Sequence, residues 1–266
     1  MNPAAFTGSI PENYEKYLGP LLFEPYALDL TERINIKGVI SVLEIACGTG
    51  RLTKHLRKLL PADVKLIATD LNEAMIDTSK KFIGDEGINF QPADAQELPF
   101  EDDSFDLVVC QFGIMFFPDK QKALSEIHRV LRKDGCFLFN TWDKIENNQL
   151  THTANTIVTE FFDNDPPVFY QTPFSMHDTD AIKKLLEDSS FREIEITKVK
   201  KEGVSPSSED AVKGLLYGNP IHMEIESKNP EALGKIKKEI QSEIVKRFGD
   251  HPVVTKLNAI VCKGIK

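Results

Sequence analysis

The chain has 266 residues, of which 41% are hydrophobic and 17 are phenylalanine, and its formal net charge at neutral pH is −9. This length corresponds to one large domain or two small ones, and the apolar content is ample for a packed core, which argues against a disordered chain. The acidic balance disfavours a surface that binds nucleic acid, because such surfaces normally carry a basic patch.

The cysteines and the apolar stretches indicate the compartment. No two of the four cysteines form a C-x-x-C pair, and they fall in or beside expected strands: Cys47, Cys110, Cys136 and Cys262. This pattern suits buried, reduced thiols and no metal site. The first residues lack the basic start and apolar core of a secretory signal. The most apolar stretch, 107–117, is shorter than the roughly 20 residues that span a bilayer. We therefore expect a cytoplasmic protein without a membrane or nucleic-acid partner.

Strand and helix patterns alternate between residues 39 and 142. The expected strands are 39–46, 64–70, 88–92, 105–111 and 136–141, and the expected helices are 50–60, 72–82 and 120–132. Such alternation with short loops predicts an α/β fold with a doubly wound parallel sheet. Ligands of these sheets bind beyond the carboxyl ends of the strands, so the residues that follow the strands are the first candidates for a site.

The remaining chain adds two strands and several helices. A helix is expected at 150–162, and Asp178 is placed to cap another. Strands are expected at 193–199, which alternates with period two, and at 253–262. Residues 205–249 between them are mostly helical in pattern.

A tight glycine turn lies between the first expected strand and the helix that follows it. Residues 43–50 read L-E-I-A-C-G-T-G, and nucleotide-binding enzymes of several classes use such a turn. The dinucleotide fingerprint G-x-G-x-x-G aligns with Ala46, Gly48 and Arg51, so its first and third glycines are missing. No Gly-Lys-Ser/Thr follows, which excludes a P-loop. The turn therefore suits a small group close to the backbone and lacks an obvious pyrophosphate cradle.

Three acidic residues, Glu44, Asp70 and Asp94, fall at the ends of successive expected strands. Asp70 follows the turn by about 20 residues, the position from which a carboxylate accepts hydrogen bonds from ribose hydroxyls. NAD sites and S-adenosylmethionine sites share this pairing. The alternative is a surface aspartate that caps the next helix.

Four stretches in order and at matching spacing resemble the class I S-adenosylmethionine-dependent methyltransferases. They read E-I-A-C-G-T-G, T-D-L-N-E-A-M-I, A-D-A-Q-E-L-P-F-E-D-D-S-F-D and E-I-H-R-V-L-R-K-D-G-C-F-L-F-N-T-W. Within that class they are similar to methyltransferase type 11 and to the ubiquinone and menaquinone biosynthesis methyltransferases. The resemblance implies an enzyme whose cofactor is S-adenosyl-L-methionine. It also implies a Rossmann-like, seven-stranded, mostly parallel sheet with the last strand antiparallel.

The resemblance also implies a division of the chain. Residues 1–38 form a helical segment over the cofactor site, and residues 39–204 with 250–266 form the methyltransferase core. We expect residues 205–249 to be an inserted helical cap over the ligand edge, the alternative being helices that extend the core.

The glycine turn and the second strand carry the first set of implied roles. Glu44 organises the turn and the amino group of the methionine part of the cofactor. The backbone of Ala46, Gly48 and Gly50 passes close to the cofactor, and Asp70 holds its ribose.

Residues after the second and third strands carry the adenine. By the same resemblance, Leu71 and Met75 pack near the ring, Asp94 accepts a hydrogen bond from the adenine amino group, and the Ala95 backbone N–H donates to the ring.

The methionine part is assigned to the fourth strand and the N-terminus. The resemblance places Gln111 and Phe112 beneath it, while Tyr14 and Tyr17 resemble aromatic residues that close over the cofactor. Plain helix packing is the alternative for the two tyrosines.

The acceptor is less defined. The quinone C-methyltransferases carry an Arg-Asn pair after the fourth strand, where this chain has Gln111–Asp119, Q-F-G-I-M-F-F-P-D, which counts against a quinone. The residues expected to line an acceptor pocket are Phe116, Phe117, Asn140 and Trp142. Methyl transfer from a sulfonium requires alignment, and a general base only if the acceptor must lose a proton. No catalytic residue is therefore assigned, and His152, His177 and His222 are weak candidates for a base.

We expect methyl transfer to a small-molecule acceptor by in-line displacement. A catalytically inactive S-adenosylmethionine-binding protein that acts as a partner or regulator is the first alternative. An NAD-dependent oxidoreductase is a weaker one, and a nucleic-acid or protein methyltransferase is disfavoured by the acidic charge.

Overall fold

One seven-stranded sheet organises the molecule. The computed structural model describes residues 6–266, and its strands lie in the order β3-β2-β1-β4-β5-β7-β6. They are β1 (Ser41–Ile45), β2 (Lys65–Asp70), β3 (Asn89–Pro92), β4 (Phe105–Gln111), β5 (Leu131–Trp142), β6 (Arg192–Ser205) and β7 (Val253–Ile265). The first five are parallel, and β7 is antiparallel to both β5 and β6. The predicted fold class, with its antiparallel last strand, is confirmed.

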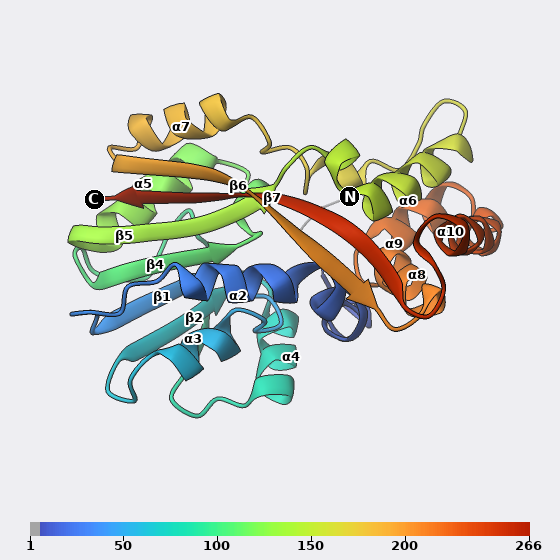
Figure 1. Ribbon diagram of the computed structural model, residues 1–266. Coiled ribbons are helices and arrows are strands. Elements are labelled where there is room, and N and C mark those ends of the chain that lie inside the picture. Colours follow the sequence, from blue (N-terminus) through green and yellow to red (C-terminus); the bar gives the residue numbers. More distant parts are fainter. Residues whose placement is uncertain (1–5) are drawn as a thin grey trace.

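Helices cover both faces of this sheet. In Figure 1, α2 (Glu24–Glu32) and α3 (Thr53–Leu59) lie in front of it, and α5 (Lys120–Val130) lies behind it beside α7 (Thr179–Asp188). The other helices are α1 (Ile10–Asn13), η1 (Tyr14–Phe23), α4 (Glu73–Ile83), η2 (Ile114–Phe116), η3 (Ile145–Asn147), α6 (Gln149–Glu160), η4 (Phe169–Gln171), α8 (Ser208–Tyr217), α9 (Ile221–Lys228) and α10 (Ala232–Phe248). None of the helices described is long and apolar enough to cross a membrane.

Short polar residues fix the starts of several helices. Asn72 accepts from the backbone N–H of Ala74 at the start of α4, and Asp119 accepts from Lys122 at the start of α5. Asp178 caps α7 as predicted. These side chains satisfy backbone donors that the first helical turn leaves free, which is why the strand-to-helix boundaries follow the sequence closely.

The boundary between α5 and β5 differs from the sequence prediction. The prediction of a helix to Arg132 is wrong, because α5 ends at Val130 and Leu131 already pairs with Phe105 of β4. The ladder then shifts register before Leu107 pairs with Cys136, and Asp134 takes a left-handed conformation in between. The β4 pairing overrides the helical pattern of the sequence here.

The β6–β7 pair is much longer than predicted and carries the helical insertion. Its ladder continues to the pairing of Ser205 with Val253, so residues 208–248 are inserted at the tip of a long hairpin. Figure 1 shows this hairpin projecting beyond the other strands toward α8, α9 and α10. There α10 contacts α6 and α8, and α8 contacts η1.

The N-terminal helices α1, η1 and α2 follow one another without a break and are fastened to the turn after β1. Arg51 forms ion pairs with Glu15 and with Glu24, and Thr49 Oγ1 donates to Glu15 at 2.6 Å. A Cβ added at Gly19 would lie 2.1 Å from Arg51 Nη2, so η1 approaches this guanidinium as closely as a glycine permits. Residues 1–5 lie outside the described residues. They belong to the expected N-terminal segment 1–38 and to the stretch in which no secretory signal is expected.

Candidate cofactor and acceptor site

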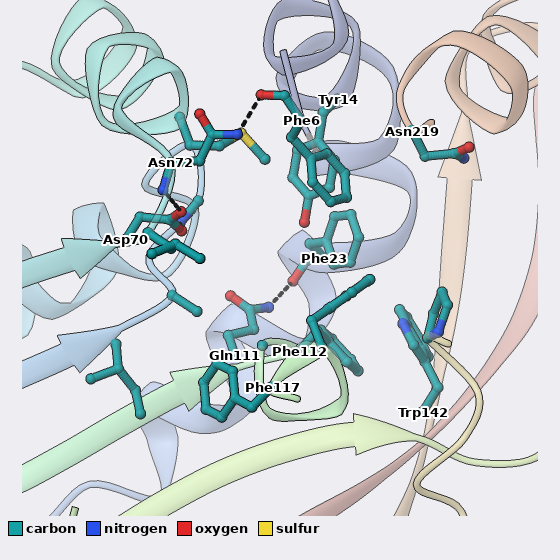
Figure 2. A pocket seen from close by; sticks show the side chains of 18 of the residues that line it. Phe6, Tyr14, Phe23, Asp70, Asn72, Gln111, Phe112, Phe117, Trp142 and Asn219 are labelled. Carbon is teal, nitrogen blue, oxygen red and sulfur yellow. Dashed lines mark hydrogen bonds between the residues drawn. The ribbon is translucent and has the colours of Figure 1, made fainter. Parts of the chain in front are cut away.

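A cavity of about 320 Å³ lies at the carboxyl ends of β1, β2, β4 and β5. Its walls combine residues that follow these strands with side chains from the N-terminal helices, from the segment 143–178 and from the insertion. Figure 2 shows Asp70 and Asn72 on one side, Trp142 and Asn219 on the opposite side, and Phe23 and Phe112 between them. The cavity therefore has two ends of different composition.

Asp70 lies at the end of β2 and faces the glycine turn. Its Oδ2 accepts from the Gly48 backbone N–H and its Oδ1 from that of Asn72, each at 2.9 Å. Burial raises the pKa of this carboxyl, and backbone N–H donors at Asn72, Gly48 and Leu71 oppose the increase. Each oxygen retains a further lone pair, so the fixed carboxylate can still accept hydrogen bonds from a diol.

The turn itself has unusual backbone geometry. Ala46, Gly48 and Gly50 all have positive φ, of 53°, 56° and 85°. A Cβ added at Gly48 meets no atom of the described chain within 4 Å, whereas one at Gly50 would lie 2.2 Å from Ser79 Oγ. Ala46 and Gly48 line the cavity, but Gly50 does not. Gly50 thus permits the close packing of α4, and Gly48 leaves open space where a ligand can approach the backbone.

Glu44 lies within β1, behind the cavity wall. Its side chain is 1% exposed, and its Oε2 has no hydrogen-bond partner among the described residues. Burial raises the pKa of Glu44 to about 8; the Thr53 hydroxyl opposes this shift and the charge of Asp70 adds to it. Burial therefore favours the neutral acid at neutral pH, and a cationic ligand group near the turn would favour the ionised form.

The residues expected around adenine all line the cavity: Leu71, Met75, Asp94 and Ala95. Leu71 is 63% exposed and lies at the rim, while Met75 and Ala95 are buried. Asp94 Oδ1 accepts from the Gln96 backbone N–H at 2.8 Å, which fixes the carboxylate. This side of the cavity therefore offers an apolar surface next to an oriented acceptor.

The N-terminal segment closes the cavity over β4. Tyr14 lines it and stacks on Phe23 with ring centroids 4.7 Å apart. Gln111, at the end of β4, donates from Nε2 to the Phe23 carbonyl at 2.7 Å (Figure 2). Tyr17 does not line the cavity; it is half-buried, and its ring lies beside Lys213 of α8. Of the two expected aromatics, Tyr14 is the one placed at the site.

Asn72 and Phe6 also belong to the wall, although the sequence reasoning did not select them. The Asn72 side chain donates to the Phe6 carbonyl at 2.8 Å, so the start of α4 holds the N-terminal segment across the opening. Asn72 belongs to the stretch T-D-L-N, in which the sequence pattern indicates only the start of a helix.

The opposite end of the cavity is aromatic. Phe112 and Trp142 stack with centroids 3.9 Å apart and an interplanar angle of 12°. Phe112 has φ of 51°, and its N–H donates to Asn140 Oδ1 at 2.9 Å. A bulky residue held with positive φ is strained, and such strain clusters at functional sites. Phe116 and Phe117 line the cavity, whereas Asn140 lies behind the wall and fixes Phe112.

Side chains from two regions without recognisable motifs complete this end. They are Asn148, Thr151, Phe169, Tyr170, Pro173 and Phe174 from the segment after β5, and Leu215 and Asn219 from the insertion. No spacing in the sequence places them together, because they come from a helix, a 3-10 turn and the end of another helix. The segment after β5 supplies more of this wall than the insertion does.

The three candidate histidines lie away from the cavity. His152, His177 and His222 are absent from its wall; Nδ1 of His177 bonds the Phe174 carbonyl, and Nδ1 of His222 bonds the Asn219 carbonyl. Residues 6–266 hold no group of three or more His, Cys, Asp or Glu side chains suited to a metal ion. All four cysteines are free thiols, with Cys136 half-buried and the others buried.

Comparison with known sequences gives a consistent result. Residues 43–139 match a methyltransferase domain family. The ubiquinone/menaquinone biosynthesis C-methyltransferase of Idiomarina loihiensis is 28% identical over 193 residues, which is 65% of this chain and 74% of that protein. The corresponding enzyme of Hahella chejuensis is 38% identical over 120 residues, 44% of this chain and 48% of that protein. The similarity thus spans from about half to three quarters of these relatives.

Solved structures extend the likeness to nearly the whole chain. The phosphoethanolamine N-methyltransferase 2 of Haemonchus contortus, in complex with S-adenosyl-L-methionine, matches with a TM-score of 0.62 and 17% identity, covering 100% of this chain and 60% of that one. The YcgJ protein of Bacillus subtilis matches with a TM-score of 0.57 and 22% identity, covering 91% and 98%. At these identities the likeness establishes the fold.

Proposed function

This chain belongs to the class I S-adenosylmethionine-dependent methyltransferases, and from that premise we propose that it methylates a small molecule held in the cavity described above. The observation that carries the proposal is that the polar end and the aromatic end belong to one continuous cavity. Asp70, Gly48 and Asp94 share one cavity with the aromatic wall around Trp142. A donor and an acceptor bound there would meet without leaving the protein.

The cofactor fits the polar end. Asp70 would hold the ribose hydroxyls, Asp94 and the Ala95 N–H the adenine, and Leu71 and Met75 its ring faces. The open space at Gly48 and the buried Glu44 carboxyl group behind the turn, whose Oε2 has no partner among the described residues, suit the amino-acid part. Gln111 and Phe112 lie beneath that part, and Tyr14 closes over it. Bound there, S-adenosyl-L-methionine supplies a methyl group on a sulfonium, an electrophile with an excellent leaving group.

The protein contributes alignment and exclusion of water. The aromatic side chains fix the acceptor on the side opposite Asp70, while the N-terminal helices, held through Arg51 and Asn72, cover the opening. Positioning of two reactants can supply roughly 7–11 kcal/mol of the barrier reduction. No side chain needs to form a covalent bond for this reaction class.

We propose that the inserted helices within 205–249 act as the cap over the acceptor end, with 6–38 over the cofactor end and 39–204 with 250–266 as the core. Leu215 and Asn219 of the insertion contribute to the cavity wall, and α8 packs on η1. The absence of cations from the described cavity wall and the net charge of −9 support a small, non-nucleic-acid acceptor.

Ligand-dependent melting tests this function. S-adenosylhomocysteine at 100 times its dissociation constant should raise the free energy of unfolding by about 2.7 kcal/mol. NADH at the same concentration should have no effect. Stabilisation by NADH alone would favour an oxidoreductase, and binding of S-adenosylhomocysteine without turnover on a broad acceptor panel would favour an inactive binding protein.

A further inference from the structure

The acceptor end of the cavity is uncharged and has no available base. Within residues 6–266, the cavity wall contains no lysine, arginine or histidine, and its two carboxylates are Asp70 and Asp94. Asp70 accepts from the backbone N–H groups of Gly48 and Asn72, and Asp94 accepts from that of Gln96, so both carboxylates are fixed in place. Figure 2 shows Asp70 on the side of the cavity opposite Trp142. Neither carboxylate is placed to take a proton from an acceptor at the aromatic end.

The two tyrosines of the wall are equally unsuited. Tyr170 donates its hydroxyl proton to the Leu215 carbonyl at 2.8 Å, and burial raises its pKa above the ordinary value. Burial also raises the pKa of Tyr14, and the Glu15 charge adds to that shift. Both phenols therefore stay protonated at neutral pH and act as donors.

An environment of this kind sorts acceptors by the charge of their reactive form. Transfer from water to an apolar site disfavours the charged form of any group. A phenol, alcohol, thiol or carbon acid would therefore keep its proton at the aromatic end, with no group to remove it. An ammonium would instead lose its proton on entry and present a neutral nitrogen with a free lone pair.

The charge produced by transfer also suits the wall. The nitrogen lone pair forms the new N–C bond, the S–C bond breaks, and its electron pair stays on sulfur as a neutral thioether. The positive charge thus moves from sulfur to nitrogen, where the aromatic rings of the wall can stabilise it by roughly 0.5–2 kcal/mol. The proton of the methylated ammonium leaves to solvent after release.

Thr151 offers a hydrogen-bond partner at this end. Thr151 lines the cavity from α6, and its hydroxyl forms no hydrogen bond with another described residue. Its neighbour Asn148, by contrast, is fully engaged: Nδ2 donates to the Asn258 carbonyl at 3.0 Å and Oδ1 accepts from the Asn258 N–H at 2.9 Å. A hydroxyl can accept from an amine N–H, which makes Thr151 a candidate for orienting the nitrogen.

On the basis of the proposed function, we propose that this enzyme is an N-methyltransferase for an uncharged amine nitrogen on an apolar, ring-bearing molecule without a carboxylate or phosphate group. An anionic substituent would be buried without a cationic partner, which is strongly unfavourable. Thr151 is the positioning residue for the nitrogen.

Matched acceptors test this assignment. Arylalkyl amines from benzylamine to tryptamine, their alcohol and thiol analogues, phenylalanine and a hydroquinone are each incubated with the enzyme and S-adenosylmethionine. Release of S-adenosylhomocysteine and the product mass are recorded. The expected result is N-methylation of at least one simple amine. The kcat/KM for that amine should rise tenfold with each pH unit until the pH reaches the amine's own pKa. Above that pKa it should exceed the kcat/KM for any alcohol, thiol, phenylalanine or hydroquinone analogue at least tenfold. Methylation of the hydroquinone, an alcohol or a thiol in preference to the amines overturns the proposal, as does turnover of none of them.

Binding separates this proposal from the cofactor assignment. Trp142 is the single tryptophan of the chain and lies in the wall, so its fluorescence reports occupancy of the acceptor end. In the presence of S-adenosylhomocysteine, 2-phenylethylamine should bind about tenfold more tightly at a pH above its own pKa than at one pH unit below it, because only the neutral amine enters the apolar end. Equal affinities contradict the amine assignment while leaving the function intact. Failure of S-adenosylhomocysteine itself to bind removes the proposed function instead.

Variants identify the positioning residue. Thr151→Val should raise KM for the amine about tenfold, and Thr151→Ser should restore it. Phe82→Leu, on the exposed side of α4, is the control and should change neither kcat nor KM. An unchanged KM in Thr151→Val would show that the hydroxyl does not orient the acceptor.

Discussion

The two ends of the cavity are built in different ways. The end proposed to hold the cofactor consists of strand-end carboxylates and backbone amides, as in the bonds from Gly48 and Asn72 to Asp70. The end proposed to hold the acceptor consists of side chains from segments far apart in the chain, as in the stack of Phe112 on Trp142 and the wall at Thr151. The first end depends on the fold of the sheet. The second depends on how the segment after β5 and the inserted helices pack against the sheet.

This difference means that the two ends should fail separately when mutated. Changes at strand ends should affect cofactor affinity, changes in the aromatic wall should affect the acceptor, and changes in the anchors of the N-terminal helices should affect stability and both ligands. The following variants test that separation.

Removal of the N-terminal anchor should have the largest effect. Arg51 is 12% exposed and pairs with Glu15, itself 11% exposed, so Arg51→Met leaves a nearly buried carboxylate without its partner. Breaking such a pair costs about 3–5 kcal/mol. We expect a corresponding loss in the free energy of unfolding in urea. Arg57→Met, which removes hydrogen bonds to main-chain carbonyls at the other end of α3 and no ion pair, is the comparison. An equal loss of unfolding free energy in both variants would show that the ion pair of Arg51 with Glu15 contributes no more than the hydrogen bonds of Arg57.

Loss of the strand-end carboxylate should reduce cofactor affinity next most strongly. Hydrogen bonds to a charged group contribute about 1.5–3 kcal/mol, so Asp70→Ala should weaken S-adenosylhomocysteine binding by roughly 100-fold in calorimetry. The exposed Asp77 of α4 provides the control Asp77→Ala. Unchanged affinity in Asp70→Ala, with the fold intact by circular dichroism, would mean that the ribose lies elsewhere.

The buried Glu44 should give the cofactor-free protein a distinctive pH dependence. Its folded pKa of about 8 exceeds the unfolded value of 4.5, so the folded state binds more protons between these limits. Its contribution to stability is therefore present below pH 4.5 and is lost as the pH rises toward 8, by at most about 1.4 kcal/mol per pH unit. Chemical denaturation of wild type and Glu44→Gln across that window measures the difference. Parallel curves would show that Glu44 titrates normally.

Changes in the aromatic wall should have the smallest and most selective effect. An aromatic pair contributes about 0.5–1.5 kcal/mol beyond its burial, so Trp142→Phe should raise KM for the acceptor several-fold. The affinity for S-adenosylhomocysteine should remain within twofold of wild type, because Trp142 lies opposite Asp70. A parallel loss of cofactor affinity would show that the two ends are coupled.

The central sheet could be predicted from the sequence because its signals are local. The apolar run of β4 and the caps Asp119 and Asp178 lie within a few residues of the features that they specify. The start of β5 could not be predicted, because the strand conformation of Leu131 depends on its pairing with Phe105, 26 positions away in the chain. The same reason explains the missed length of β6 and β7, whose outer halves are stabilised by each other.

By itself, the sequence determined the order of the core elements and the strand-end residues Gly48, Asp70 and Asp94, since parallel strands bring their carboxyl ends to one edge. Only the tertiary structure decided that Tyr14 lines the cavity while Tyr17 lies against α8, that Gly50 serves the packing of α4, and that Thr151 joins the cavity wall. These placements depend on how helices distant in the chain pack against the sheet. That packing is a sum of many weak, non-local contacts that leaves no short pattern in the sequence.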